Sequence, residues 1–148
     1  MAYKLKTFSV SLVCEPEAFP VGAPTRSAED AERVARLIYS TLDADKEHFV
    51  LLSLNNKNRI NGFKIISTGS LTASLVHPRE VYRAALALCA AAVIFVHNHP
   101  SGEPAPSQED IELTRRLKES GEILGIRVLD HIVLGDGRYY SFSNSGLL

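Results

Sequence analysis

The chain has 148 residues, 45% of them hydrophobic, and its 16 lysines and arginines against 17 acidic residues give a net charge of −1 at pH 7. This length suits one domain with a core of ordinary size, and no window approaches the roughly 18 apolar residues of a membrane span. Nucleic-acid-binding domains typically have an excess of basic residues, and this chain has none. Its net charge therefore does not support a nucleic-acid partner, although a local basic patch could still form.

The first elements suggest a short arm before the main domain. Residues 3–14 alternate in a way that predicts a strand at a sheet edge, given its lysines. Residues 15–26 hold three prolines and a glycine, which predicts a loop. We therefore expect an extended N-terminal arm, residues 1–24, and one domain, residues 25–148. Ser27 is expected to cap the first helix of that domain, whose apolar residues recur at helical spacing.

A hairpin and a second helix follow in the predicted order. Residues 47–54 are typical of a buried strand, and residues 55–58 form a turn. Residues 59–68 return as the hairpin partner, with Gly62 marking a bulge. The second helix begins at Pro78, because a proline at the first helical position loses no hydrogen bond. Its many alanines favour close packing on a sheet.

The last third of the chain contains a strand, a helix and a second hairpin. Residues 93–96 are wholly apolar, which is typical of a central strand covered on both faces. Residues 97–106 form a proline-rich loop, and Ser107 begins the third helix. Residues 125–134 predict a strand that turns back as a hairpin. The order of elements predicts an α/β fold in which a mixed sheet carries helices on its faces.

The cysteines restrict the chemistry of any metal site. Cys14 and Cys89 are far apart, and the chain has no Cys-x-x-Cys pair. We interpret both as buried or incidental free thiols, which indicates a reducing, cytoplasmic setting. The mixed apolar start of the chain makes a poor signal peptide. A transition metal would therefore depend on histidine and carboxylate ligands.

Two histidines stand one residue apart where the buried strand is expected to end, in the pattern His97-x-His99-x₇-Ser107-x-x-Asp110. In an extended segment, side chains two residues apart point to the same side, so the two imidazoles can face one point. The prolines of the loop keep it compact and bring Asp110 back toward the histidines. Two imidazoles and one carboxylate would leave an open fourth position on a tetrahedral zinc ion, as a catalytic site requires.

The residues alone leave two alternatives open. A His-x-His pair is weak support for a metal by itself, and Ser107-x-x-Asp110 is also a variant of the helix capping box. Asp130 and His131 fit either a carboxylate–imidazole pair behind the site or ordinary residues of the core beside a turn.

The motif resembles a known one. His-x-His-x₇-Ser-x-x-Asp is similar to the JAMM motif of MPN/JAB metalloprotease-like domains. Its extended form, HNHPSGEPAPSQED, with PREVYRAAL before it and LDHIVLG after it, closely resembles the RadC family from about residue 25 onward. The resemblance implies a cytidine-deaminase-like three-layer fold. It also implies a zinc ion held by His97, His99 and Asp110, with a water as the fourth ligand.

The same resemblance implies two further functional residues. JAMM enzymes use a glutamate on the strand after the first helix, and by position this is Glu47. Glu47 would move a proton from water to a leaving amine, and Ser107 would stabilise the oxyanion. A solvated acid at a strand end is the other interpretation of Glu47. Glu80 is its rival, although it lies in a helix beside Arg79 and is expected to pair locally.

The function that the resemblance implies is a zinc-dependent hydrolase of the JAMM type. Its substrate would be an amide or isopeptide bond in an unidentified protein or peptide, with no membrane partner. The first alternative is a RadC-like metal-binding interaction module in DNA repair or DNA metabolism, with little turnover. The second is a metal-dependent nuclease. Longer RadC-like chains carry an N-terminal helix-hairpin-helix region of a DNA-binding type, and residues 1–24 do not resemble it. The sequence specifies neither the substrate nor the oligomeric state.

Overall fold

The computed structural model describes residues 22, 24–69 and 76–148. The strand expected at residues 3–14, nearly all of the N-terminal arm and Cys14 lie outside these described residues. The helices and strands of the described chain are α1 (Ala28–Tyr39), β1 (Glu47–Leu54), β2 (Ile60–Gly69), α2 (Pro78–Ala87), β3 (Ala92–Asn98), α3 (Gln108–Leu124), β4 (Arg127–Leu134) and β5 (Tyr139–Ser141). No helix in this part of the chain is long and apolar enough to cross a membrane.

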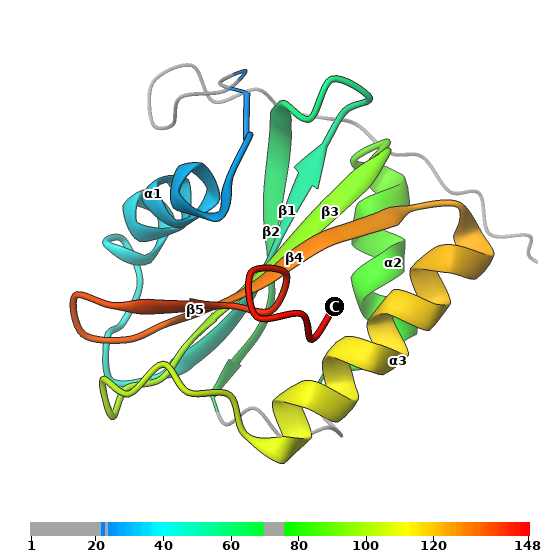
Figure 1. Ribbon diagram of the computed structural model, residues 1–148. Helices are drawn as coiled ribbons and strands as arrows, with labels where there is room; N and C mark the ends of the chain where they lie inside the picture. The colour runs from blue at the N-terminus through cyan, green and yellow to red at the C-terminus, as the bar shows by residue number, and fades with distance from the viewer. Residues whose placement is uncertain (1–21, 23, 70–75) are drawn as a thin grey trace, which may run out of the picture.

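The strands form one mixed sheet in the order β2-β1-β3-β4-β5. β3 and β4 run parallel, whereas the other neighbouring pairs are antiparallel. α1 covers one face of the sheet, and α2 and α3 cover the other (Figure 1). The predicted α/β fold, with a mixed sheet between two layers of helices, is confirmed.

The core consists of two apolar clusters, one on each face of the sheet. Successive residues of β1 divide between them: Val50 and Leu52 pack toward α1, whereas Phe49 and Leu51 pack toward α2 and α3. β3 lies in the middle of the sheet and residues 93–96 are buried, as the apolar run predicted. Removal of this apolar surface from water is the main favourable term that holds the layers together.

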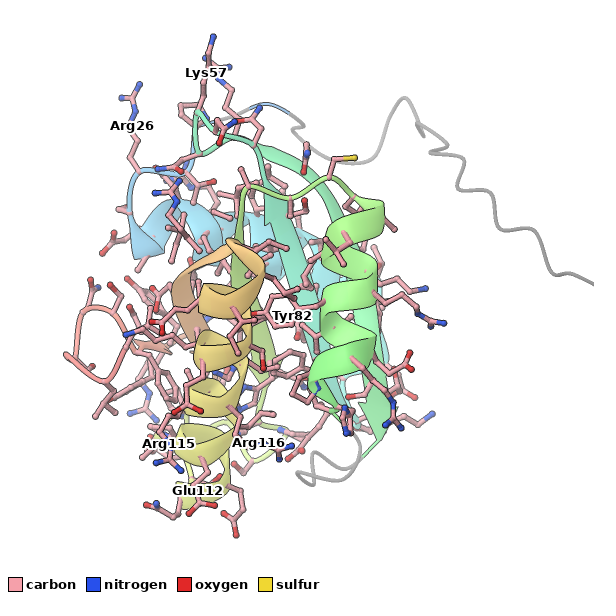
Figure 2. The ribbon with its side chains drawn as sticks, turned by 90° about the vertical axis from the view of Figure 1, so that its right-hand side faces the viewer. Arg26, Lys57, Tyr82, Glu112, Arg115 and Arg116 are labelled. Atoms are coloured by element: carbon pink, nitrogen blue, oxygen red, sulfur yellow. The ribbon has the colours of Figure 1, made fainter. Side chains whose placement is uncertain are left out.

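A close contact between α2 and α3 sets the position of the third helix. The two helices lie side by side on the sheet, with Tyr82 between them (Figure 2). The Tyr82 hydroxyl donates a hydrogen bond to the backbone carbonyl of Leu117. Gly121 makes room for it, because a Cβ there would lie 2.5 Å from the hydroxyl oxygen. This packing holds α3 against the sheet and so places its N-terminus beside the end of β3.

One local prediction needs correction. The bulge expected at Gly62 lies at the preceding residue, Asn61, since Ser53 pairs with Gly62 and Leu54 with Ile60. β2 has a second extra residue, Ile66, near its other end. Glycine at position 62 leaves room for the side chain of Leu88 at the end of α2. A Cβ atom on residue 62 would lie 2.9 Å from a Leu88 methyl group. Cys89 is a free thiol, as expected, and it is exposed, so of the two interpretations the incidental thiol applies to it.

Candidate metal centre

His97, His99 and Asp110 meet where β3 ends and α3 begins. The Nε2 atoms of His97 and His99 are 3.0 Å apart. The Asp110 carboxylate oxygens lie 3.3 Å from the first of these atoms and 3.5 Å from the second. One ligand atom from each residue lies within 4.8 Å of the others, which is compatible with a single ion between them. The set is a candidate metal site, and it contains the three ligands that the sequence predicted.

His97 lies within strand β3 and not after its end. The sequence placed both histidines after the buried strand, but β3 continues through His97 and Asn98. It does so because β1 and β4 still pair with it there, with Phe49 opposite His97 on one side and Leu134 opposite Asn98 on the other. His97 is fully buried, whereas His99 is only half-buried. The site is therefore anchored in the sheet on one side and accessible on the other.

The tautomer of His99 follows from its hydrogen bond. Its Nδ1 atom lies 2.8 Å from the backbone carbonyl of Glu103. A carbonyl only accepts, so Nδ1 carries a hydrogen, and in the neutral ring Nε2 presents a lone pair to the site. The Nδ1 atom of His97 is also engaged, at 2.8 Å from a nitrogen of His131. Nitrogen lone pairs and a carboxylate that converge in this way favour a cation between them.

The charges of the site shift the pKa values of its members. Burial alone would raise the pKa of the Asp110 carboxyl. When their Nε2 atoms carry a proton, the His97 and His99 rings donate hydrogen bonds to this carboxylate, and these bonds outweigh burial and hold its pKa well below its ordinary value. The hydrogen bond to Asp110 in turn raises the pKa of His99, against a smaller opposing effect of burial. Asp110 is thus an anion at neutral pH, the form in which a carboxylate binds a metal.

The capping box predicted as an alternative is present, and it coexists with the metal-site geometry. The Ser107 hydroxyl oxygen accepts from the Asp110 backbone N–H at 3.1 Å, and Asp110 Oδ2 accepts from the Ser107 N–H at 2.7 Å. The same carboxylate faces both histidines. The cap therefore fixes the orientation of Asp110 toward the site.

Glu47 begins β1 beside this site. Phe49 pairs with His97, so Glu47 lies two residues further along, next to the end of β3. The pKa of His99 is raised mainly by its hydrogen bond to Asp110, is lowered by burial, and is raised again by the Glu103 carbonyl and the Asp110 charge. The negative charge of Glu47 makes a smaller contribution that also raises it. Glu80, the rival, is exposed on α2 and pairs with Arg83 at 2.8 Å, as its local environment predicted.

Sequence reasoning missed Asn98. Its side-chain nitrogen donates to the Lys46 carbonyl at 2.9 Å, and its side-chain oxygen accepts from the His48 backbone N–H at 2.8 Å. These bonds hold the backbone on both sides of Glu47. They extend the contact between β1 and β3 beyond Phe49 and His97, the last residues that pair between the two strands. Only the alternation of side chains in an extended segment, which turns Asn98 away from the two histidines, hinted at a separate role.

Of the two alternatives for Asp130 and His131, the carboxylate–imidazole pair does not form. Asp130 accepts instead from the backbone N–H groups of His131 and Ser143 and from the Ser141 hydroxyl. The His131 imidazole lies against His97, and no local pattern signals this contact between residues 34 positions apart. Complete burial lowers the pKa of His131 well below its ordinary value, so its ring is neutral.

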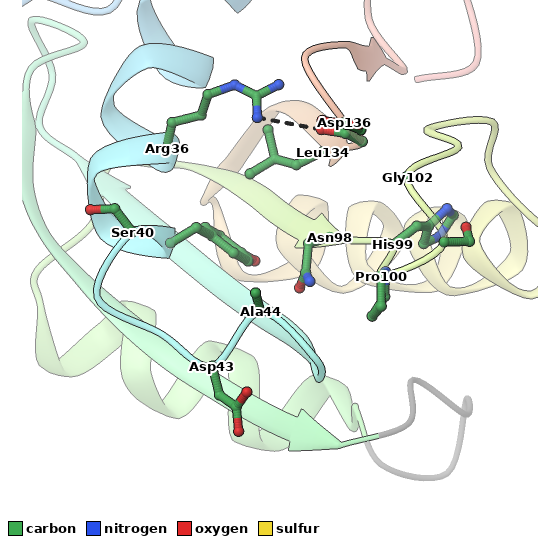
Figure 3. A pocket seen from close by; sticks show the side chains of 13 residues that line it. Arg36, Ser40, Asp43, Ala44, Asn98, His99, Pro100, Gly102, Leu134 and Asp136 are labelled. Carbon is green, nitrogen blue, oxygen red and sulfur yellow. Dashed lines mark hydrogen bonds between the residues drawn. The ribbon is translucent and has the colours of Figure 1, made fainter.

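A pocket of about 520 Å³ opens beside His99, between the end of α1 and the loops that follow β3 and β4 (Figure 3). Asn98, Ala44 and Pro100 contribute to its wall near the site. Farther away, the Arg36 guanidinium donates to the backbone carbonyl of Gly135 at 3.4 Å. Of the three residues of the candidate metal site, His99 lines this pocket.

Comparison with known proteins agrees with the resemblance seen in the sequence motif. Residues 25–147 match the family described as RadC-like JAB domain. The UPF0758 protein GSU0386 of Geobacter sulfurreducens is 59% identical over 110 residues, which cover 74% of this chain and 48% of that protein. A UPF0758 protein of Methanosarcina mazei is 48% identical over 129 residues, 86% of this chain and 56% of the relative. The chain spans about half the length of these curated relatives.

Proposed function

Because the chain belongs to the family of RadC-like JAB domains, we propose that it is a zinc-dependent hydrolase that cuts an amide or isopeptide bond in a protein or peptide. One observation carries the proposal: two imidazole Nε2 atoms 3.0 Å apart share a small space with the Asp110 carboxylate. An acid, Glu47, lies close enough for its charge to affect His99. A metal with an acid beside it is the arrangement that metal-assisted hydrolysis needs.

The residues present fit a zinc ion. Imidazole nitrogen and carboxylate oxygen are ordinary zinc ligands, and three protein ligands leave one position open for chemistry. His97, His99 and Asp110 would hold the ion. When bound, zinc would polarise the carbonyl of the substrate and lower the pKa of a coordinated water.

Glu47 would move the proton in this reaction. Its carboxylate would accept a proton from the attacking water and deliver it to the nitrogen that leaves when the C–N bond breaks. Asn98 would act as a positioning residue, since its side chain holds the backbone on both sides of Glu47. The pocket that His99 lines would accommodate part of the substrate.

Ser107 would stabilise the oxygen anion that forms on the attacked carbonyl. Its hydroxyl oxygen already accepts from the Asp110 N–H, so its own hydrogen stays available for donation. A donor directed at a developing oxyanion contributes more in a site that excludes water.

Release of new amines from a protein extract tests the proposal. The amines of the extract are first blocked by reductive methylation, so that cleavage of a peptide bond or of a lysine isopeptide bond creates a free amine. We expect the zinc-loaded chain to release specific new amines, identified by mass spectrometry. The chelator-treated chain should release none. Stoichiometric zinc without any new amine would contradict the hydrolase and favour the interaction module.

The substitution Ser107→Ala separates the cap from the chemistry. Loss of the cap should lower the free energy of unfolding of the metal-free protein by about 1 kcal/mol, measured by denaturant titration. Zinc content should stay unchanged, because Ser107 is not a ligand. The rate of amine release should fall roughly 10²–10³-fold, the usual effect of losing one oxyanion donor. Ser107→Thr, which keeps the hydroxyl, should preserve both properties. Unchanged release per folded Ser107→Ala molecule would leave Ser107 as a cap only.

A further inference from the structure

A chain of buried hydrogen bonds runs behind the candidate metal site. Nδ1 of His97 lies 2.8 Å from Nε2 of His131, and Nδ1 of His131 lies 2.5 Å from the Thr114 hydroxyl oxygen. That hydroxyl donates to the backbone carbonyl of Asp110 at 2.6 Å. The chain thus begins at one expected ligand, passes through β4 and α3, and ends at the backbone of another.

The last acceptor in this chain determines which atom donates in each hydrogen bond. The Asp110 carbonyl can only accept, so the Thr114 hydroxyl gives its hydrogen to it and its oxygen accepts from His131. The hydrogen of His131 is then on Nδ1, and its Nε2 accepts. The remaining hydrogen is on Nδ1 of His97, which leaves the Nε2 lone pair of His97 directed at His99 and Asp110.

Aromatic side chains hold the His131 ring in this orientation. It stacks on Phe142 at a centroid distance of 4.9 Å and an angle of 19°. Phe49 and Phe95 contact it edge-on, with centroids at 5.4 and 6.0 Å. His131 is fully buried, and Thr114 is 2% exposed. A polar side chain this deep in an apolar environment is retained only where its hydrogen bonds are made.

We propose that His131, set by Thr114, is the positioning residue that fixes the tautomer and ring orientation of His97 for metal binding. This inference rests on the metal site of the proposed function but does not depend on hydrolysis. Metal-binding histidines usually donate their second ring nitrogen to a carboxylate, a carbonyl or water. Here a neutral imidazole takes that place, and it is linked through one hydroxyl to the helix that supplies the carboxylate ligand.

Zinc affinity of four variants tests the proposal, measured by competition with a chromophoric chelator. His131→Phe fills the apolar space but offers no acceptor to His97, so its zinc affinity should fall roughly 10–100-fold. His131→Gln places an amide oxygen near the former Nε2 position and should keep most of the affinity. Thr114→Val keeps the shape and removes the hydroxyl, so it should also bind zinc more weakly. His48→Phe, at another buried histidine whose ring bonds to Thr68 and Asp43, should leave zinc affinity unchanged.

The Co²⁺-loaded proteins provide a second measurement, because the visible absorption of Co²⁺ depends on its coordination geometry. His131→Phe should alter these bands, and His131→Gln should retain them. Wild-type affinity in both His131→Phe and Thr114→Val would overturn the proposal and make His131 an ordinary core histidine. An equal loss in His131→Phe and His131→Gln would also overturn it, since the acceptor would then not matter. Zinc binding by the wild-type chain without any hydrolysis would contradict only the proposed function.

Discussion

Replacing His97 or His99 with alanine should abolish stoichiometric zinc binding. Each substitution removes one of the three proposed ligands, whose candidate ligand atoms lie within 4.8 Å of one another. Two remaining ligands are too few for a stable zinc site, which uses three or four. Metal content after dialysis, measured by mass spectrometry, should fall from about one zinc per chain to background.

Two further variants at the same site provide controls. Asp110→Asn keeps the size of the side chain but loses its charge, so zinc should bind more weakly. Ser107→Ala, which disturbs the cap next to the ligands, should retain zinc. Circular dichroism of each variant checks that the fold is intact. Full zinc content in both folded histidine variants would place the metal elsewhere in the chain.

Glu47→Gln should lower the rate of amine release from the blocked extract by roughly 10²–10⁴-fold, the usual contribution of general acid–base catalysis. Glutamine keeps the shape of the side chain but cannot accept a proton from water. Folding and zinc content should be unchanged, because Glu47 is proposed to lie beside the metal without binding it.

Glu80→Gln is the matched control for this variant. Glu80 is an exposed acid on α2, paired with Arg83, and its loss should leave the rate of amine release unchanged. A Glu47→Gln protein with the wild-type rate would exclude Glu47 as the proton carrier. Loss of zinc from the same variant would instead identify Glu47 as a ligand.

Local patterns in the sequence were sufficient for most of the secondary structure. The strand predicted at residues 47–54 is β1, and Ser27 and Ser107 cap α1 and α3. These features depend on hydrophobic periodicity and on hydrogen bonds between residues three or four positions apart. The spacing of His97 and His99, two residues apart, is also a local feature. In an extended segment this spacing brings their rings to one point, as the motif predicted.

The sequence by itself thus determined the elements, the three expected ligands and the resemblance to a family, whereas the tertiary structure alone decided what surrounds the ligands. His131 reaches His97 because β3 and β4 pair in parallel with Phe95 opposite His131, which puts both imidazoles on the same face of the sheet. Asn98 holds the start of β1 from 50 residues away. Such contacts depend on the register between strands, and a shift of one residue would turn His131 to the opposite face. No short stretch of sequence contains that register, because it results from the packing of all three layers.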